Sequence, residues 1–279
     1  MITRKLNRII PGKDKLAEIK AQSRQYHNFA GLTPIVTLPS KVDKTNYASP
    51  IENQGDEGSC TAHANAGVVE YLQNVEITHK ISGAAASLIF PGGAFARISR
   101  SMIYWNERDL EGTTDQDSGA MLSDGVAVVE KIGVCREILW PYSDATMYTK
   151  PSANCYAEAA QHKVLYSYQI NDLQHMKHSL ASGFPFVFGV VCYDSFLSDV
   201  VAQDGIIPLP GSNENVQGGH ALSCFGYDDN MTANGLTGFF KFRNSWGTGW
   251  GQAGYGWIPY AYLTDPELSS EFYTYRYTK

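Results

Sequence analysis

Near the C-terminus the chain reads Asn244-Ser245-Trp246-Gly247-Thr248-Gly249-Trp250-Gly251, and two stretches upstream complement this one. The first is Gln54-Gly55-Asp56-Glu57-Gly58-Ser59-Cys60, and the second is Gly218-Gly219-His220-Ala221-Leu222. Together they supply a thiol nucleophile, an imidazole base and a carboxamide that can orient the imidazole, with a glutamine six residues before the thiol. Nucleophilic acyl transfer requires this set of groups.

The three stretches resemble those of the papain family of cysteine peptidases, in which Gln, Cys, His and Asn follow one another in the same order. The resemblance extends from about Leu38 to about Leu263. It implies an α+β, papain-like fold with two lobes. A helical lobe would carry the cysteine, an antiparallel β-barrel-like lobe would carry the histidine and asparagine, and the active-site cleft would lie between them. A lone Cys-His pair would be weak evidence, whereas three linked motifs are specific.

The resemblance also implies a cysteine peptidase that hydrolyses peptide bonds through a thioester acyl-enzyme. Cys60 would be the nucleophile and His220 the general acid and base. Asn244 would orient the imidazole, and the Gln54 side chain with the Cys60 backbone N–H would form the oxyanion hole. A helix N-terminus and a neighbouring imidazolium would lower the pKa of the thiol, which predicts a thiolate–imidazolium ion pair. This chemistry needs no metal and no organic cofactor.

Three residues are candidates for contacts with a peptide or protein substrate. Gly119 lies where the family has a glycine-rich strand that pairs with the substrate backbone, and Gly219 directly precedes the base. Trp246 is expected to shield the bond between the histidine and the asparagine from water.

The chain departs from the family pattern in ways that concern specificity more than chemistry. Thr61 follows the nucleophile where the family usually has an aromatic residue. His220 and Asn244 lie 160 and 184 residues after the nucleophile, beyond the usual spacing of roughly 130 to 150. Longer loops at residues 206–217 and 228–237 would explain this spacing.

Local patterns predict helices in the first half of the chain and strands in the second. Ser59 is a plausible N-cap for a helix over residues 60–73, and further helices are expected over 120–132 and 172–182. Aromatic and β-branched runs predict strands at residues 186–193, 221–227, 239–244, 255–258 and 272–277. This order is typical of an α+β chain with two lobes, mainly at residues 50–140 and 160–279.

Residues 1–37 are polar and mixed in charge, and they precede Leu38-Pro39-Ser40-Lys41-Val42-Asp43, which resembles the start of the mature family domain. We expect an N-terminal arm or short pro-segment over 1–37 and a peptidase domain over 38–279. The arm is much shorter than the family's helical inhibitory pro-region. Its basic residues are interrupted by Asp14 and Glu18, which favours a solvated or docking segment over a nucleic-acid arm.

Composition narrows the partners and the compartment. A net charge of −6 and a pI of about 5.6 provide no positive field for nucleic acid or for an anionic membrane. The chain shows no secretory h-region and no stretch long enough to span a bilayer, which predicts a cytoplasmic or particle-associated protein. The odd number of cysteines favours reduced thiols, although an oxidising setting could bridge Cys135 and Cys155. The five are Cys60, Cys135, Cys155, Cys192 and Cys224.

Other patterns are better explained by structure than by chemistry. His63, one turn after the nucleophile, is expected to pack within the helix or to be exposed rather than to act as a second base. His175 and His178 have helical ligand spacing without accompanying ligands, which favours a solvated helix face. Cys192 and Cys224 are expected inside strands. The terminal tyrosines should share one face of a strand: Tyr273, Tyr275 and Tyr277.

Two other functions remain possible from the residues alone. A structural or assembly component could retain the papain-like fold and use the arm to dock to a larger assembly. A transpeptidase or an amidase could use the same mechanism with a different acceptor. The short arm, the reduced cysteines and the lack of a secretory signal resemble the prokaryotic or phage-type branch of the family.

Overall fold

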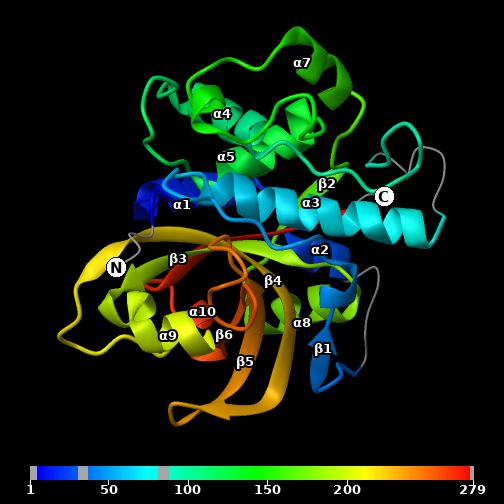
Figure 1. The fold of residues 1–279 in the computed structure, drawn as a ribbon. Coiled ribbons are helices and arrows are strands. Elements are labelled where there is room, and N and C mark those ends of the chain that lie inside the picture. Colours follow the sequence, from blue (N-terminus) through cyan, green and yellow to red (C-terminus); the bar gives the residue numbers. More distant parts are fainter. Residues whose placement is uncertain (1–4, 31–36, 81–87, 277–279) are drawn as a thin grey trace.

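The computed structural model describes residues 5–30, 37–80 and 88–276 of the 279-residue chain. Helices mostly from the first half of the sequence gather on one side, and strands mostly from the second half form an antiparallel sheet on the other side (Figure 1). The helix that begins at Cys60 lies between these two parts. The predicted α+β fold with two lobes is confirmed.

The sheet has seven strands among the described residues. Its order is β2-β7-β3-β4-β5-β6, and β1 also pairs with β4. Every pair of these strands is antiparallel. The strands are β1 (Lys41–Asp43), β2 (Tyr166–Gln169), β3 (Phe186–Tyr193), β4 (Val216–Ala233), β5 (Leu236–Arg243), β6 (Tyr255–Pro259) and β7 (Ser269–Arg276).

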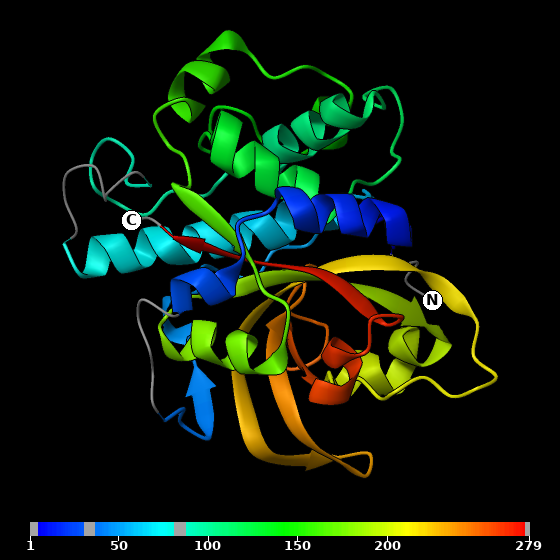
Figure 2. The same cartoon turned by 180° about the vertical axis from the view of Figure 1, so that it is seen from behind.

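The helices pack mostly above the sheet, while α8, α9 and α10 lie beside its other face (Figures 1 and 2). The α-helices are α1 (Lys13–Gln22), α2 (Tyr26–Ala30), α3 (Cys60–Thr78), α4 (Arg100–Glu111), α5 (Leu122–Ala127), α6 (Asp144–Met147), α7 (Ala153–Ala159), α8 (Leu173–Ala181), α9 (Asp199–Asp204) and α10 (Tyr260–Thr264). Shorter turns are η1 (Thr45–Tyr47), the π-helical η3 (Val128–Ile132) and η4 (Asp194–Leu197).

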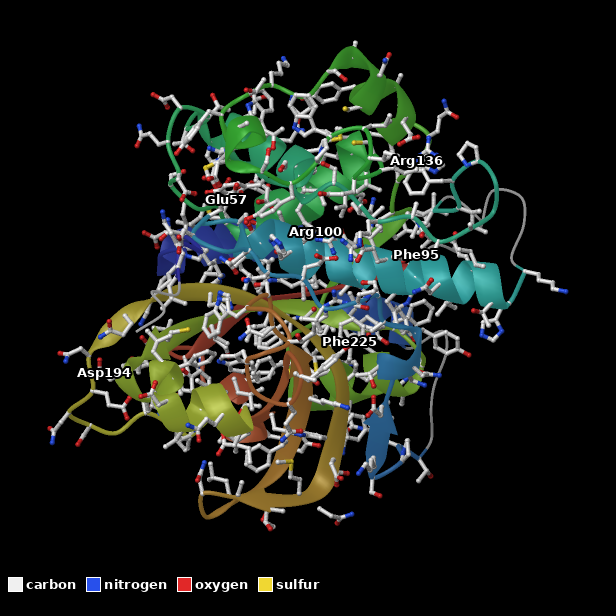
Figure 3. All side chains as sticks on the ribbon, viewed as in Figure 1. Glu57, Phe95, Arg100, Arg136, Asp194 and Phe225 are labelled. Atoms are coloured by element: carbon white, nitrogen blue, oxygen red, sulfur yellow. The ribbon has the colours of Figure 1, made fainter. Side chains whose placement is uncertain are left out.

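Helix α3 is buried on nearly all sides, as expected for a helix that lies between two layers. It extends five residues beyond the predicted end at Gln73. Tyr71 packs edge-on against Phe225 of β4, with ring centroids 5.6 Å apart, and Phe225 lies on the sheet directly below the helix (Figure 3). Ser59 is the residue directly before α3, as predicted, but its side chain does not cap the helix, because it hydrogen-bonds Tyr142 instead of a helix amide. A second apolar cluster fills the other side of the sheet around Phe186 and Phe240.

The other predicted helices are confirmed with altered ends. The helix expected over residues 172–182 is α8, with Asp172 as its N-cap. The one expected over 120–132 is shorter, because α5 passes into the π turn η3, which stops at Gly133 as predicted. Helix α4 has no counterpart among the predictions, although Ser99 caps its first turn through the Met102 N–H. A serine that can cap a helix in this way is a sequence signal for the start of a helix.

All five predicted strands are present, but one predicted loop is wrong. Residues 228–233 continue β4, and Ala233 pairs with Leu236 of β5 in a hairpin. The turn residues Asn234 and Gly235 both have positive φ, 52° and 74°. Asn-Gly is the usual sequence of such a two-residue turn because both positions need left-handed backbone. The extra spacing between His220 and Asn244 is therefore a long hairpin. The predicted loop over 206–217 is likewise shortened, because β4 begins at Val216. Tyr277, at the end of the last predicted strand, lies outside the described residues.

Within the described parts of the chain, no helix combines the length and apolarity needed to cross a membrane.

Candidate active site

Helix α3, strand β4 and the end of strand β5 bring the predicted catalytic side chains together. Cys60 is the first residue of α3, His220 lies in β4, and Asn244 directly follows β5. The Cys60 sulfur accepts a hydrogen bond from the backbone of Ala221, the neighbour of the predicted base. Gln54 lies in the loop before α3. The tertiary contacts thus place all four candidates in one buried site.

The imidazole of His220 is fixed on both its edge and its face. Nε2 lies 2.9 Å from Oδ1 of Asn244, which also accepts the Ser245 N–H at 2.8 Å. Trp246 stacks on the ring with centroids 4.6 Å apart and planes 20° apart. Nδ1 is buried and has no hydrogen-bond partner among the described residues. Because the asparagine occupies one nitrogen, the other remains available for proton transfer.

Gln54 is held in place by polar contacts across the site. Its Oε1 accepts a 2.6 Å hydrogen bond from Oγ of Ser245, and its Nε2 donates to the Glu57 carbonyl at 2.8 Å. Nε2 also lies 3.4 Å from the carbonyl oxygen of Lys5. The amide donor that would stabilise an oxyanion therefore already faces a carbonyl group of the N-terminal segment.

Residues 5–10, called here the covering segment, lie across the site. The Arg8 N–H donates to the Gly219 carbonyl at 3.0 Å on one side, and the Ile9 N–H donates to the Ala120 carbonyl at 3.0 Å on the other. The backbone N–H of Asn7 faces the sulfur of Cys60. The segment thus bridges the two walls of the site and covers the nucleophile.

The two glycines predicted to contact substrate lie directly against this segment. A Cβ atom on Gly119, which has a φ of 74°, would lie 1.4 Å from the Asn7 carbonyl oxygen. A Cβ atom on Gly219 would lie 2.3 Å from the Arg8 carbonyl oxygen. Only residues without side chains allow a peptide backbone to approach this closely. The third candidate, Trp246, stacks on the histidine.

The predicted ion pair is absent while the covering segment is in place. Burial raises the pKa of the Cys60 thiol to about 11, although the Ala221 and Asn7 backbone amides oppose this rise. Burial lowers the pKa of His220 to about 4, against the effect of its hydrogen bond with Asn244. Both groups are therefore neutral near pH 7, because desolvation disfavours each charged form. The position of the thiol at a helix N-terminus does not overcome that penalty.

Asp117 organises the wall next to the nucleophile, a role that the sequence motifs did not indicate. Its Oδ1 accepts the Gly58 N–H at 2.9 Å and the Tyr104 hydroxyl at 2.5 Å, while Oδ2 accepts Lys5 Nζ at 2.5 Å. These contacts link the loop before Cys60 to α4 and to the covering segment. The signal that could have revealed it is an acidic residue two positions before Gly119, the glycine predicted to contact substrate.

The remaining histidines have structural roles. His63 is buried with its ring against Tyr142, which confirms helix packing and excludes the alternative of surface exposure. His175 hydrogen-bonds its own cap Asp172. The solvated position predicted for His178 is wrong, because the side chain is buried and its Nδ1 lies 2.9 Å from the Tyr26 hydroxyl. The arm residue Tyr26 folds back onto this face of α8.

The five cysteines are free and buried. Cys192 and Cys224 lie in β3 and β4, as predicted. Cys135 and Cys155 pack in one small apolar cluster without a bond between them. Tyr273 and Tyr275 are both buried on β7, as expected for one face of a terminal strand. The described residues include no group of three or more His, Cys, Asp or Glu side chains that could hold a metal.

Comparison with known proteins agrees with this geometry. The family model for papain family cysteine proteases matches residues 100–270. A peptidase C1-like protein of Acanthamoeba polyphaga mimivirus is 35% identical over 251 residues, which cover 87% of this chain and 72% of that protein. A cysteine protease of Blomia tropicalis is 23% identical, and the match covers 80% of this chain and 61% of that protein.

Solved structures show the same fold. The crystal structure of xylellain, a cysteine protease from Xylella fastidiosa, matches with a TM-score of 0.80 and 32% identity over the whole of both chains. Digestive procathepsin L2 from Tenebrio molitor matches with a TM-score of 0.65 and 20% identity, over 97% of this chain and 77% of that chain. At that lower identity the likeness concerns the fold alone.

Proposed function

Because this chain belongs to the papain family of cysteine proteases, we propose that it cleaves peptide bonds with Cys60 as nucleophile and His220 as general acid and base. The chain is a cysteine peptidase, a hydrolase whose substrates are peptides or proteins. The observation that carries the residue assignment is the 2.9 Å contact between His220 Nε2 and Asn244 Oδ1, which leaves Nδ1 for the proton of the thiol.

The proposed reaction has two halves. In the first, Sγ of Cys60 bonds to the substrate carbonyl carbon while its proton passes to Nδ1 of His220. The carbonyl oxygen becomes an oxyanion, which Gln54 Nε2 and the Cys60 N–H stabilise by a few kcal/mol per donor. The C–N bond then breaks as the imidazolium gives its proton to the leaving amine. In the second half, His220 deprotonates a water molecule that attacks the thioester and regenerates the thiol.

We further propose that the covering segment keeps this site inactive, so that it acts as a short inhibitory pro-segment. The backbone N–H of Asn7 faces the Cys60 sulfur, so the segment occupies the space next to the nucleophile that a substrate carbonyl would need. It also places the Lys5 carbonyl next to the Gln54 donor. These contacts argue for an inhibitory role and against the use of residues 5–10 to dock to a larger assembly.

Reactivity of the thiols tests the assignment. The reduced protein without residues 1–10 is treated with an epoxysuccinyl thiol-protease inhibitor, and the modified residue is located by peptide mass mapping. We expect labelling at Cys60 alone, because the other four cysteines are buried away from the site. Cys60→Ala should abolish labelling and hydrolysis, whereas the matched variant Cys192→Ala should preserve both. Peptide hydrolysis that persists in Cys60→Ala would refute the assignment.

Asn244→Ala is expected to lower kcat by about 10- to 100-fold with little change in KM, because a misoriented imidazole impairs proton transfer without removing substrate contacts. Steady-state kinetics on a fluorogenic peptide would measure this split, with the wild-type and variant proteins both lacking residues 1–10. Asn244→Asp retains an oxygen acceptor for Nε2 and should recover part of the loss. A change confined to KM would contradict the orienting role.

A further inference from the structure

The side chain of Arg8 turns away from the covering segment into the interior of the protein. Its Nη2 lies 2.6 Å from Oε2 of Glu271 and 2.7 Å from Oγ of Ser270. Both members of the ion pair are fully buried, with 0% of either side chain exposed. Arg8 and Glu271 are 263 positions apart in the chain, so nothing in the local sequence indicates the contact.

The protein is shaped to receive this guanidinium. A Cβ atom on Gly189 of β3 would lie 2.0 Å from Cζ and Nε of Arg8, so the missing side chain provides the space. Gly189, Ser270 and Glu271 are called here the arginine site. The residue that fills the arginine site directly follows the residue that faces the nucleophile. Asn7 faces Cys60, and Arg8 donates its backbone N–H to the carbonyl of Gly219, the residue before His220.

The backbone at Glu271 has an unusual conformation, and its carboxylate is directed toward Arg8. Its φ is 61°, which places a residue with a side chain in the left-handed region. The pairing of β3 with β7 shifts here, from Val187 opposite Tyr273 to Gly189 opposite Ser270, so Glu271 lies in a bulge. Bulges next to active sites redirect side chains, and strain of this kind persists where the surroundings enforce it. The Ser123 N–H holds Oε1 at 2.9 Å and leaves Oε2 for the cation.

When the covering segment leaves, the carboxylate of Glu271 loses the cation that it is paired with. Arg8 is the only ion-pair partner of Glu271 among the described residues. Two more carboxyl groups, Glu111 and Asp124, lie close enough for the charge of Glu271 to raise the pKa of each, although burial is the larger cause. A buried carboxylate without its cation is strongly unfavourable. A guanidinium can fill this site because it carries several N–H donors: Nη2 of Arg8 alone donates to Glu271 and to Ser270, while Nε and Nη1 are buried without a hydrogen-bond partner among the described residues.

We propose that the arginine site is a specificity subsite that selects an arginine side chain of the peptide substrate, and that Arg8 occupies it as an internal substitute. The inference rests on the proposed peptidase function and names the substrate class for it. Arg8 also anchors the covering segment, so the same contact sets both substrate choice and inhibition.

The full-length Arg8→Ala variant exposes the arginine site to added substrate. Fluorogenic tetrapeptides carry arginine or norleucine at each of the four positions before the scissile bond, with alanine elsewhere. We expect faster hydrolysis than in the wild-type chain. We also expect kcat/KM at least about tenfold higher for arginine than for norleucine at one of these positions.

Glu271→Gln in the Arg8→Ala background tests the residue itself. Glutamine retains an oxygen for the Ser123 N–H and removes the charge, so the ratio of kcat/KM for arginine peptides to that for norleucine peptides should fall to about one. The matched control is Glu267→Gln, which neutralises an exposed carboxylate paired with Lys13. This control should leave the arginine preference unchanged.

A binding measurement makes the inference independent of hydrolysis. The synthetic peptide of residues 5–10 and its analogue with norleucine in place of arginine compete with epoxysuccinyl labelling of Arg8→Ala. At least about tenfold stronger protection by the arginine peptide is expected, and Glu271→Gln should abolish that difference. Equal protection, an arginine preference that survives Glu271→Gln, or Arg8→Ala labelled no faster than wild type would overturn the inference. Labelling of Cys60 without hydrolysis of any peptide would instead refute the proposed function.

Discussion

Deleting residues 1–10 is expected to raise the rate of Cys60 alkylation at pH 7 by at least about a hundredfold. With a pKa of about 11, only about one thiol in ten thousand is ionised at that pH, and the thiolate is the reactive species. Removal of the covering segment admits water to the sulfur and to His220, which removes most of the desolvation penalty. The helix N-terminus and the imidazolium can then stabilise the thiolate.

The packing of the N-terminal arm determines the residue at which the shortened chain should begin. A chain that begins at Pro11 retains Gly12, the N-cap residue of α1, and Tyr26, which is fully buried against α8. A larger deletion to residue 37 would also remove Tyr26 and expose the apolar cluster that it fills. Thermal unfolding of the two chains should therefore be compared alongside their alkylation rates.

The pH profile distinguishes a pKa effect from simple access. With the covering segment present, the alkylation rate should rise with pH from neutrality to about pH 11, where the thiol ionises. Without it, the profile should level off below pH 7. A parallel increase at every pH would mean that the segment only blocks access. An unchanged rate in a folded deletion variant would contradict the inhibitory role altogether.

Glu70→Ala is expected to destabilise the protein by about 3–5 kcal/mol, the usual cost of breaking a buried ion pair. Glu70 lies on α3 and binds Arg100 of α4 through two contacts, at 2.7 and 2.8 Å, with both side chains almost fully buried. It also accepts the Ile98 N–H at 2.9 Å. Figure 3 shows Arg100 directly over α3. The variant would leave this guanidinium buried without its ion-pair partner, with only the charges of Glu52 and Glu137 nearby.

The network around Glu70 also supports the site. Ser49 hydrogen-bonds Glu70 and accepts two 2.9 Å bonds from Nη1 of Arg243, the residue before Asn244. A loss of peptidase activity larger than the loss of folded protein is therefore expected in Glu70→Ala. Arg243→Lys would test this link, because it retains the charge and removes the fork of the guanidinium.

The stability effect should depend on pH in a defined direction. Burial is the largest single effect on Glu70 and raises its pKa, but the charges of Arg100 and Arg243 and the hydrogen bonds from Arg100 and Ser49 together outweigh burial, so the pKa in the folded protein lies below the ordinary value. Stability from a carboxylate with a lowered pKa is present above its unfolded pKa and is lost as the pH falls through the folded one. The difference between wild type and Glu70→Ala in urea unfolding should therefore shrink below about pH 4.5.

Glu158→Ala is the matched control for this prediction. Glu158 pairs with Arg136, and the two side chains are 12% and 33% exposed; because solvent weakens a partly exposed pair, the change should cost less than Glu70→Ala. If both variants had the same free energy of unfolding, the buried network would not be the source of the stability that we assign to it.

Local sequence was sufficient for the elements with strong short-range signals. The motifs around Cys60, His220 and Asn244 indicated the family, and a run of aromatic and β-branched residues predicted β3 from its first residue to its last. The hairpin turn at Asn234 was missed although its signal is local, because the residues around it are polar and exposed and so suggest a loop. Ser59 was misassigned as a cap because its hydroxyl is bonded to Tyr142, 83 positions away.

By itself the sequence determined the chemistry available to this protein: a thiol, an imidazole, an asparagine and a glutamine in the order of the papain family. The tertiary structure decided the state of that chemistry. It covered Cys60 with residues 5–10, and burial left both the thiol and the imidazole neutral. It also joined Arg8 to Glu271. The physical reason is that desolvation and ion pairing depend on which distant segments share one water-free space, and no local pattern encodes that.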